Sequence, residues 1–274
     1  MLVVVTPRNS APRKPGPATD QAGTRRVKSR KGAGSETPND GDALRLFCFP
    51  YAGGGTTVFH RWPEGLSGPV KVHAVELPGR GRKFAADPAR RMDDLVDAVI
   101  DSINPHLANP FSFFGHSLGA LVAFEVARAV RARLDVEPVA LYVSAHPGPQ
   151  VPNDQPPLHA LSDPELRAEL RRVGGTPQEV LANDEFMRLL LPTLRADFEV
   201  SDTYTYTPGA PLSCPIVAWG GVDDPQVSQE DLQAWAEQTT GPFAFAMLPG
   251  GHFFIDHNRR ELLAALDTSV TLWH

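Results

Sequence analysis

Apolar residues recur along most of the chain in short blocks of two kinds. Continuous apolar runs of four to eight residues are typical of buried strands, whereas apolar residues three or four apart are typical of helices that bury one face. Runs of the first kind, most of them followed by a segment of the second kind, cover residues 44–50, 70–77, 111–116, 139–144, 215–221 and 243–248. Repeated strand–helix order predicts an α/β fold with a mostly parallel central sheet covered by helices.

The amphipathic segments between these runs predict the covering helices. Residues 92–107 carry Leu95, Val99 and Ile103 four apart, and aspartates in the first turns suit the positive end of a helix dipole. Further helices are expected directly after residue 117 and over residues 228–239 and 258–271, and residues 57–66 form another amphipathic segment.

The first 41 residues lack periodic apolar positions. They are rich in Pro, Gly, Ser and basic residues, a composition that cannot bury enough apolar surface to offset the entropy of ordering. We therefore expect residues 1–41 to be a disordered basic leader, a solvated extension rather than a segment that binds an acidic partner. One folded domain is expected over residues 42–274.

Composition and charge limit the classes of function. The 274 residues, 42% of them hydrophobic, suffice for one large α/β domain with a full core. The net charge is −6, but residues 1–42 hold eight Lys/Arg against four Asp/Glu, so the folded part is about ten charges negative. A negatively charged body gives no reason to expect a nucleic acid as partner.

Cysteine usage and hydropathy bear on the compartment. Cys48 and Cys214 both lie in apolar runs, which predicts buried free thiols and a reducing compartment. No apolar run approaches the roughly eighteen residues of a membrane span. The opening MLVVV is short and follows no basic residues, unlike a signal peptide. These features predict a soluble cytoplasmic protein, and a monomer is the default expectation.

The candidate nucleophile is Ser117. The segment FSFFGHSLG is an apolar run that breaks into Gly-His-Ser-Leu-Gly and continues with helical spacing, so strand, sharp turn and helix follow one another. Such a turn presents its central serine at the edge of the sheet. Gly115 and Gly119 are expected because a side chain at either position would collide with the neighbouring strand or helix.

Two backbone amides are candidates for an oxyanion hole. The amide of Leu118 begins the helix, where unpaired N–H groups and the helix dipole favour negative charge. The glycine-rich loop after the first strand supplies a second donor around Ala52, because the glycines allow a close approach to a substrate.

The general base is predicted to be His252. It lies between a glycine pair and two phenylalanines after the last strand, and it comes last in the order Ser, Asp, His of sheet hydrolases. A neutral imidazole is the appropriate base for a serine hydroxyl near neutral pH. His146, at the end of an earlier strand, is the alternative. His116 is expected to serve packing, because a side chain next to a sharp turn points elsewhere.

The acid is predicted to be Asp224, which follows the strand before the histidine strand in the arrangement Gly-x-x-Asp-Pro. Its neighbour Asp223 is the alternative, since only one of the two can point at the imidazole. Arg80 and Arg82 follow the second strand and could pair with a phosphate or an acidic surface. A solvated basic loop explains them equally well, so neither is assigned to the site.

Between residues 150 and 206 the alternation stops and helical spacing continues without a strand. Ser162 and Glu165 form a predicted capping box, Gly174-Gly175 closes the helix, and Pro192 is expected to interrupt or kink a later one. This helical insertion is predicted to form a lid over the serine. Five apolar residues in it are expected mostly to pack in the core rather than line an acyl channel: Leu189, Leu190, Leu191, Leu194 and Phe198.

Taken together, several segments resemble type II thioesterases, the free-standing editing enzymes that accompany modular polyketide and non-ribosomal peptide synthases. These segments are FCFPYAGGG, ELPGRGR, FFGHSLGA, LRRVGGTP, LLLPTLRADF, WGGVDDP and LPGGHFF. The resemblance covers residues 44–272, and the combination is much more specific than any single motif. It implies an α/β-hydrolase fold with a mobile helical lid.

The resemblance also implies a reaction. The substrate would be an acyl chain held as a thioester on the phosphopantetheine arm of an acyl or peptidyl carrier protein, and the role would be to clear stalled or misprimed units. The family pattern puts the nucleophile, acid and base on Ser117, Asp224 and His252, with oxyanion amides on Ala52 and Leu118. The chain departs from the family in carrying Ala145-His146 where Gly-Arg is common, and in its leader.

No cofactor is expected, because the sequence shows no clustered His/Cys spacing and the glycine loop after Pro50 lacks the Gly-Lys-Ser/Thr ending of a phosphate cradle. Rival readings are a general carboxylesterase or acyl-CoA thioesterase, a chain-terminating thioesterase of a synthase, and a hydrolase-like binding protein without activity.

Overall fold

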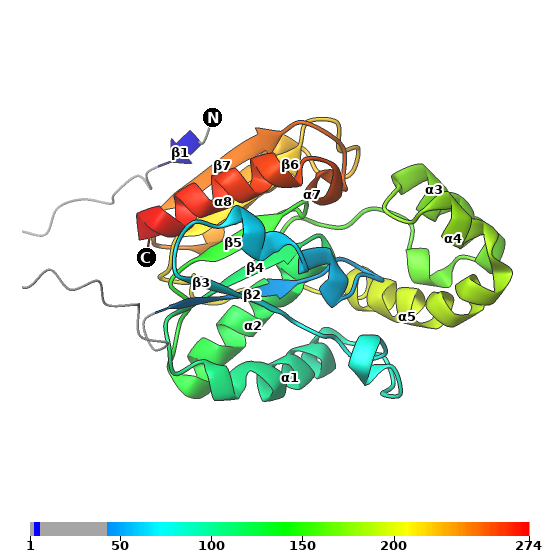
Figure 1. Cartoon of the computed structure of the whole chain (residues 1–274), viewed down its shortest axis with the longest axis horizontal. Coiled ribbons are helices and arrows are strands. Elements are labelled where there is room, and N and C mark those ends of the chain that lie inside the picture. Colours follow the sequence, from blue (N-terminus) through cyan, green and yellow to red (C-terminus); the bar gives the residue numbers. More distant parts are fainter. Residues whose placement is uncertain (1–2, 6–42, 274) are drawn as a thin grey trace, which may run out of the picture.

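The structure, a computed structural model, describes residues 3–5 and 43–273 (Figure 1). All six predicted strands form, as β2 (Leu44–Phe49), β3 (Val70–Ala74), β4 (Phe111–His116), β5 (Leu141–Ser144), β6 (Ile216–Gly221) and β7 (Phe243–Leu248). They pair in parallel in one sheet of order β1-β7-β6-β5-β4-β2-β3. Parallel pairing puts the carboxyl ends of the strands, and the loops after them, at one edge of the sheet.

Helices cover both faces of this sheet because its strands are apolar on both sides. In β2, Phe47 and Phe49 enter one core cluster, and Leu46 and Cys48 enter the other, as the two-residue period of a strand requires. The first cluster packs on α1 (Met92–Ile103), α2 (Leu118–Leu134) and α6 (Gln229–Gln233); the second packs on α7 (Phe254–His257) and α8 (Arg259–Trp273). Figure 1 shows α8 and the α1–α2 pair on opposite sides of the sheet.

One further strand, β1 (Val3–Val5), pairs antiparallel with β7, with Val4 opposite Ala244. The prediction of disorder over residues 1–41 is wrong for these three residues; the rest of the leader lies outside the described residues. Valine favours extended backbone, and β7 would otherwise leave an unpaired edge. The three valines therefore pair with β7, although the composition of the leader did not predict a strand.

The predicted amphipathic segment over residues 57–66 forms two 3-10 turns, η1 (Thr56–Phe59) and η2 (Trp62–Gly65). Pro63 lies in the first turn of η2, where the missing N–H of a proline costs no helical hydrogen bond. Phe59 and Trp62 are buried, so the segment has the apolar face that its sequence predicts. The other 3-10 turns are η3 (Gly81–Lys83), η4 (Asn104–His106), η5 (Leu158–Ala160) and η6 (Ala234–Gln238).

Between β5 and β6, residues 145–215 form a helical insertion with α3 (Asp163–Val173), α4 (Gln178–Ala182) and α5 (Asp184–Asp202). The capping box forms, with the Ser162 amide donating to Glu165 Oε2 at 2.9 Å, and α3 ends at Gly174 with a φ of +87°. α5 runs through Pro192 without the predicted interruption. A proline costs a helix one backbone hydrogen bond, which the packing on both sides of Pro192 outweighs here.

The helical insertion has its own apolar core. Leu191 and Leu194 are buried as expected, but among residues of the insertion rather than against the sheet. Leu190 and Phe198 are partly buried against the same cluster, and Leu189 is 59% exposed. The other members of the insertion core are Leu166, Leu170, Leu181 and Met187.

Both cysteines are buried and unpaired, as predicted. Burial raises the pKa of Cys214 to about 12 and that of Cys48 well above its ordinary value, so both thiols stay protonated. Among the described residues, no helix has the length and apolarity to cross a membrane.

Candidate active site

Ser117 lies at the turn between β4 and α2, with a φ of +53° and a ψ of −125°. This backbone conformation is strained for a residue with a side chain. The flanking glycines are required by close approach: a Cβ at Gly115 would lie 2.1 Å from the carbonyl oxygen of Gly119, and one at Gly119 would lie 2.2 Å from that of Phe49. The turn is therefore tight enough to present the serine hydroxyl beyond the end of the strand.

The structure brings three predicted side chains into one hydrogen-bonded row. His252 Nε2 lies 3.0 Å from Ser117 Oγ, and His252 Nδ1 lies 2.8 Å from Asp224 Oδ2. The Asp224 side chain is fully buried, and its Oδ1 accepts from the Gln226 amide at 2.8 Å. Because the carboxylate can only accept, Nδ1 carries the proton and Nε2 is left as the acceptor for the serine hydroxyl.

Two loops have to touch for this row to form. A Cβ at Gly221 would lie 2.4 Å from the carbonyl oxygen of Gly250, so the loop after β6 runs directly against the loop after β7. The amide of Asp223 donates to that same carbonyl at 2.9 Å. The Asp223 side chain is exposed, so the structure turns Asp224 and not its neighbour toward the imidazole.

The two other candidate histidines make different contacts. His146 Nδ1 donates to the Pro147 carbonyl at 2.7 Å, and burial lowers its pKa to about 4. His116 is fully buried; its Nε2 donates to the carbonyl of His252 at 3.0 Å and its Nδ1 accepts from Ser144 Oγ at 2.9 Å. Burial holds the pKa of His116 well below its usual range, so this neutral ring supports the backbone of the His252 loop.

The predicted oxyanion amides border the serine. Residues 51–54 form a turn in which the Gly54 amide donates to the Tyr51 carbonyl at 2.8 Å, and Gly53 has a φ of +74° that favours glycine. In the described part of the chain, neither the Ala52 amide nor the Leu118 amide donates to a protein acceptor. Two free donors beside a serine are suited to a developing oxyanion.

A cavity of about 70 Å³ lies over these groups. Ala52, Ser117 and His252 line it from the sheet side, and the helical insertion lines it with Leu158, Leu166, Leu170, Val173 and Phe198. This volume is far below the roughly 300–1,000 Å³ typical of pockets for drug-sized ligands. Phe198 thus borders the cavity, whereas most of its apolar neighbours on α5 do not.

The comparisons with known proteins agree with this geometry. The family model described as a thioesterase domain matches residues 44–270. The chain belongs to the thioesterase family. Gramicidin S biosynthesis protein GrsT of Aneurinibacillus migulanus is 42% identical to this thioesterase over 225 residues, 82% of this chain and 88% of that protein.

Two further relatives agree with this assignment. Thioesterase PikA5 of Streptomyces venezuelae is 38% identical over 82% of this chain and 80% of its own length. The solved structure of the RedJ thioesterase from the prodiginine pathway of Streptomyces coelicolor has a TM-score of 0.78 and 39% identity, and covers 88% of this chain and 91% of that one. The predicted type II thioesterase family and α/β-hydrolase fold are confirmed, and the protein is a hydrolase of thioesters.

Sequence reasoning missed one part of the thioesterase's site. Arg82 is 91% exposed in its side chain, as a solvated loop predicts, but Arg80 is buried and paired with Asp197 of α5. Asp197 itself gave a signal, because it falls three residues after Leu194 on the apolar face of its helix. A carboxylate at such a position needs a buried partner.

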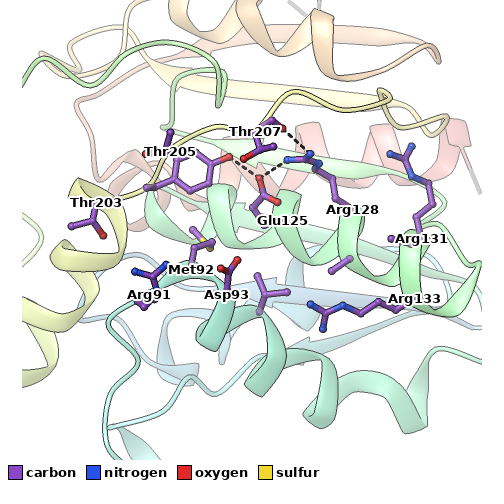
Figure 2. Close-up of a pocket in the computed structure, with 14 residues that line it drawn as sticks. Arg91, Met92, Asp93, Glu125, Arg128, Arg131, Arg133, Thr203, Thr205 and Thr207 are labelled. Atoms are coloured by element: carbon purple, nitrogen blue, oxygen red, sulfur yellow. Dashed lines mark hydrogen bonds and ion pairs between the residues drawn. The ribbon is translucent and has the colours of Figure 1, made fainter.

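A second cavity of the thioesterase, about 560 Å³, lies away from Ser117 between α1, α2 and the segment after α5 (Figure 2). Several arginines line it. Arg128 pairs with Glu125 and donates to the Thr207 carbonyl, and Arg131 donates to the carbonyls of Ala210 and Pro211. These guanidinium groups hold the segment after α5 against α2. Within the described residues, no group of three or more His, Cys, Asp or Glu side chains is placed to hold a metal ion.

Proposed function

We propose that this thioesterase hydrolyses acyl chains from the phosphopantetheine arm of an acyl or peptidyl carrier protein, and so clears misprimed or stalled units from a modular synthase. The observation that carries the proposal is the row Asp224–His252–Ser117 beside two free backbone amides. The names of relatives that act in gramicidin S and prodiginine biosynthesis support the choice of substrate.

The first half-reaction transfers the acyl group to the enzyme. Ser117 Oγ attacks the thioester carbonyl carbon while His252 Nε2 takes the hydroxyl proton, and Asp224 stabilises the resulting imidazolium. The amides of Ala52 and Leu118 donate to the oxyanion of the tetrahedral intermediate. The C–S bond then breaks, and His252 returns the proton to the departing pantetheine sulfur.

The second half-reaction releases the acid. Water loses a proton to His252 as it attacks the acyl-serine carbonyl, the same two amides hold the oxyanion, and the C–O bond to Ser117 breaks as the serine recovers its proton. Every proton in this sequence moves through His252. The reaction therefore requires no metal or nucleotide, and we propose that the enzyme uses none.

The helical insertion acts in this proposal as a lid over about residues 150–206 of a domain that spans 42–274. The cavity of about 70 Å³ that its side chains leave over Ser117 supports a short acyl group as substrate. We also propose that the enzyme is a monomer and that it works in the cytoplasm, where carrier proteins are loaded.

The test is hydrolysis of an acetyl or propionyl group loaded on a carrier protein, compared with the same acyl group on a simple ester. We expect faster release of acid and free thiol from the carrier-bound thioester, and loss of that release in Ser117→Ala by about 10⁴-fold or more. Circular dichroism should show the variant to be folded.

Each other outcome has a definite meaning. Preference for the simple ester would replace the proposal by a general carboxylesterase, and equal turnover of acyl-CoA would replace the carrier protein as substrate. Turnover by Ser117→Ala at the wild-type rate would remove Ser117 as nucleophile. No turnover of any of these substrates would indicate a binding protein.

A further inference from the structure

A buried ion pair joins three segments beside the candidate site. The guanidinium of Arg80, in the loop after β3, binds the Asp197 carboxylate through two contacts of 2.8 and 2.6 Å. Arg80 is 9% exposed and Asp197 is 2% exposed. A bidentate ion pair of this kind fixes the orientation of both side chains as well as the distance between them.

The same two side chains hold the turn that carries the Ala52 amide. Asp197 Oδ2 accepts from the Gly53 amide at 2.7 Å, and Arg80 Nη1 donates to the Gly54 carbonyl at 3.0 Å. The peptide between Ala52 and Gly53 is the central peptide of the turn over residues 51–54. Rotation of that peptide, the usual way in which such a turn changes type, would withdraw the Gly53 amide from Asp197. The Ala52 N–H belongs to the adjoining Tyr51–Ala52 peptide, which shares the Ala52 Cα with the central peptide, so anchoring the central peptide also restricts the direction of the Ala52 N–H.

Contact between α5 and this turn is close. A Cβ on Gly53 would lie 2.5 Å from Leu194 Cδ2, so the turn lies directly against α5. Thr193 Oγ1, on the same helix, donates to the Gly79 carbonyl at 3.1 Å in the loop that carries Arg80. α5 therefore contacts the turn over residues 51–54, which we call the oxyanion turn, through Asp197. It contacts the neighbouring loop through Thr193.

We infer that Arg80 and Asp197 are positioning residues that couple the seating of α5 to the orientation of the oxyanion turn. When α5 is seated, the Gly53 amide and the Gly54 carbonyl are both occupied, and the Ala52 amide is held beside Ser117. When α5 moves away, the Gly53 amide loses its acceptor on Asp197, Arg80 loses the carboxylate that orients its guanidinium, and the oxyanion hole loses one correctly placed donor. This inference rests on the proposed roles of Ser117 and Ala52.

The inference is tested by the rate at which an alkyl fluorophosphonate labels Ser117. This reagent forms a tetrahedral adduct whose oxygen occupies the oxyanion hole, and it needs neither carrier protein nor natural substrate. In Asp197→Asn, which keeps the side-chain shape but loses the charge, we expect the labelling rate per active site to fall about 10- to 100-fold. Binding of a non-hydrolysable acyl-pantetheine amide should change by less than about threefold, because it develops no oxyanion.

Two control variants separate positioning from general support. Arg188→Ala changes an exposed side chain of α5 that donates to the Asp184 carbonyl of its own helix, and Arg82→Ala removes an exposed arginine of the loop that carries Arg80. Both should label within about threefold of the wild-type rate. A double variant, Arg80→Met with Asp197→Leu, replaces the ion pair by apolar groups of similar volume; it should fold yet label as slowly as Asp197→Asn.

The outcomes are distinct. Labelling of Asp197→Asn or of the double variant at the wild-type rate per active site would overturn the inference and leave the proposed function standing. A purely structural role would reduce the number of labelled sites while the survivors react normally, and this too would overturn it. Failure of the wild-type protein to label would remove the proposed function, and the inference with it.

Discussion

Ser117 adopts a backbone conformation that costs a residue with a side chain about 1–3 kcal/mol. The cost arises because its Cβ is brought close to neighbouring backbone at a φ of +53°. Surrounding packing imposes it: Gly115 and Gly119 leave no room for the turn to relax. The serine hydroxyl therefore reaches His252 at the expense of local stability.

This strain predicts that Ser117→Gly is more stable to urea than Ser117→Ala, by about 1 kcal/mol. Glycine adopts the conformation freely, whereas alanine keeps the Cβ and therefore the strain; the greater entropy of glycine in the unfolded chain offsets part of the gain. Urea denaturation of the two variants measures the difference in their free energies of unfolding directly. Equal midpoints would show that the strain at Ser117 is no larger than the stability that glycine loses through its greater entropy in the unfolded chain.

Residues whose function depends on local backbone geometry could be predicted from the sequence. Ser117, Asp224 and His252 each follow a strand, and glycines mark the turns that bring them together. Arg80 could not be assigned in the same way, because its partner Asp197 is 117 residues away and only the packing of α5 brings them into contact. An arginine between glycines is otherwise typical of a solvated loop.

At the scale of elements, the helical insertion touches the site at the turn between α3 and α4. Gly175, with a φ of +82°, lies so close to Phe253 that a Cβ would be 2.3 Å from the ring. Phe253 in turn packs edge-on against His252, with ring centroids 5.2 Å apart. The absence of a side chain at Gly175 thus allows the helical insertion to lie this close to the His252 loop.

We expect Gly175→Ala to lift this turn from Phe253 and enlarge the cavity over Ser117. The measurement is kcat/KM for acyl-pantetheine thioesters of increasing chain length. The ratio of hexanoyl to acetyl should rise roughly threefold or more, since each methylene in an apolar pocket is worth a factor of about 10 or more when it is accommodated.

Gly174→Ala is the matched control. Gly174 also has a positive φ, but the nearest atom to its added Cβ is 4.0 Å away, in Phe253. An alanine at Gly174 therefore adopts a similarly unfavourable positive φ without colliding with Phe253. A similar change of chain-length ratio in both variants would attribute the effect to strain in the turn and not to contact with Phe253.

Periodicity predicted most helices and strands correctly. The local pattern of apolar residues shows which faces of a strand or an amphipathic helix are buried. Two misses share one cause: long-range contacts overrode local signals. β1 forms because β7 offers an unpaired edge, and α5 continues through Pro192 because packing holds both halves. The amphipathic segment over residues 57–66 buries its apolar residues Phe59 and Trp62 in two 3-10 turns.

For the whole molecule, buried histidines link stability to pH. Burial lowers the pKa of His146 to about 4, whereas the unfolded chain takes up the proton near 6.5. The neutral ring therefore contributes stability above about pH 6.5 that is lost as the pH falls toward 4, to a limit of about 3 kcal/mol. His116 acts in the same direction, because its pKa is also held well below the usual range.

We therefore expect His146→Asn to lose less stability on acidification than the wild type. Asparagine can still donate to the Pro147 carbonyl but takes up no proton. Free energies of unfolding in urea at pH 7 and pH 4.5 should show the wild type losing about 1–3 kcal/mol more than the variant. Identical losses would mean that His146 is protonated in the folded state.

Because the helical insertion has its own core, the wall of the cavity can change during evolution independently of the sheet that holds Ser117, Asp224 and His252. Leu166 and Leu170 line the cavity and pack with Met187 and Leu191 in the insertion core, so substitutions in this core alter the cavity wall without passing strain into the sheet that aligns Ser117, Asp224 and His252. Selection can retune which acyl group fits while the reacting atoms keep their spacing. When variants are selected in the laboratory for new acyl substrates, the selected substitutions should accumulate in the insertion. Exchanging the insertion helices between relatives is a second way to change which acyl group is accepted.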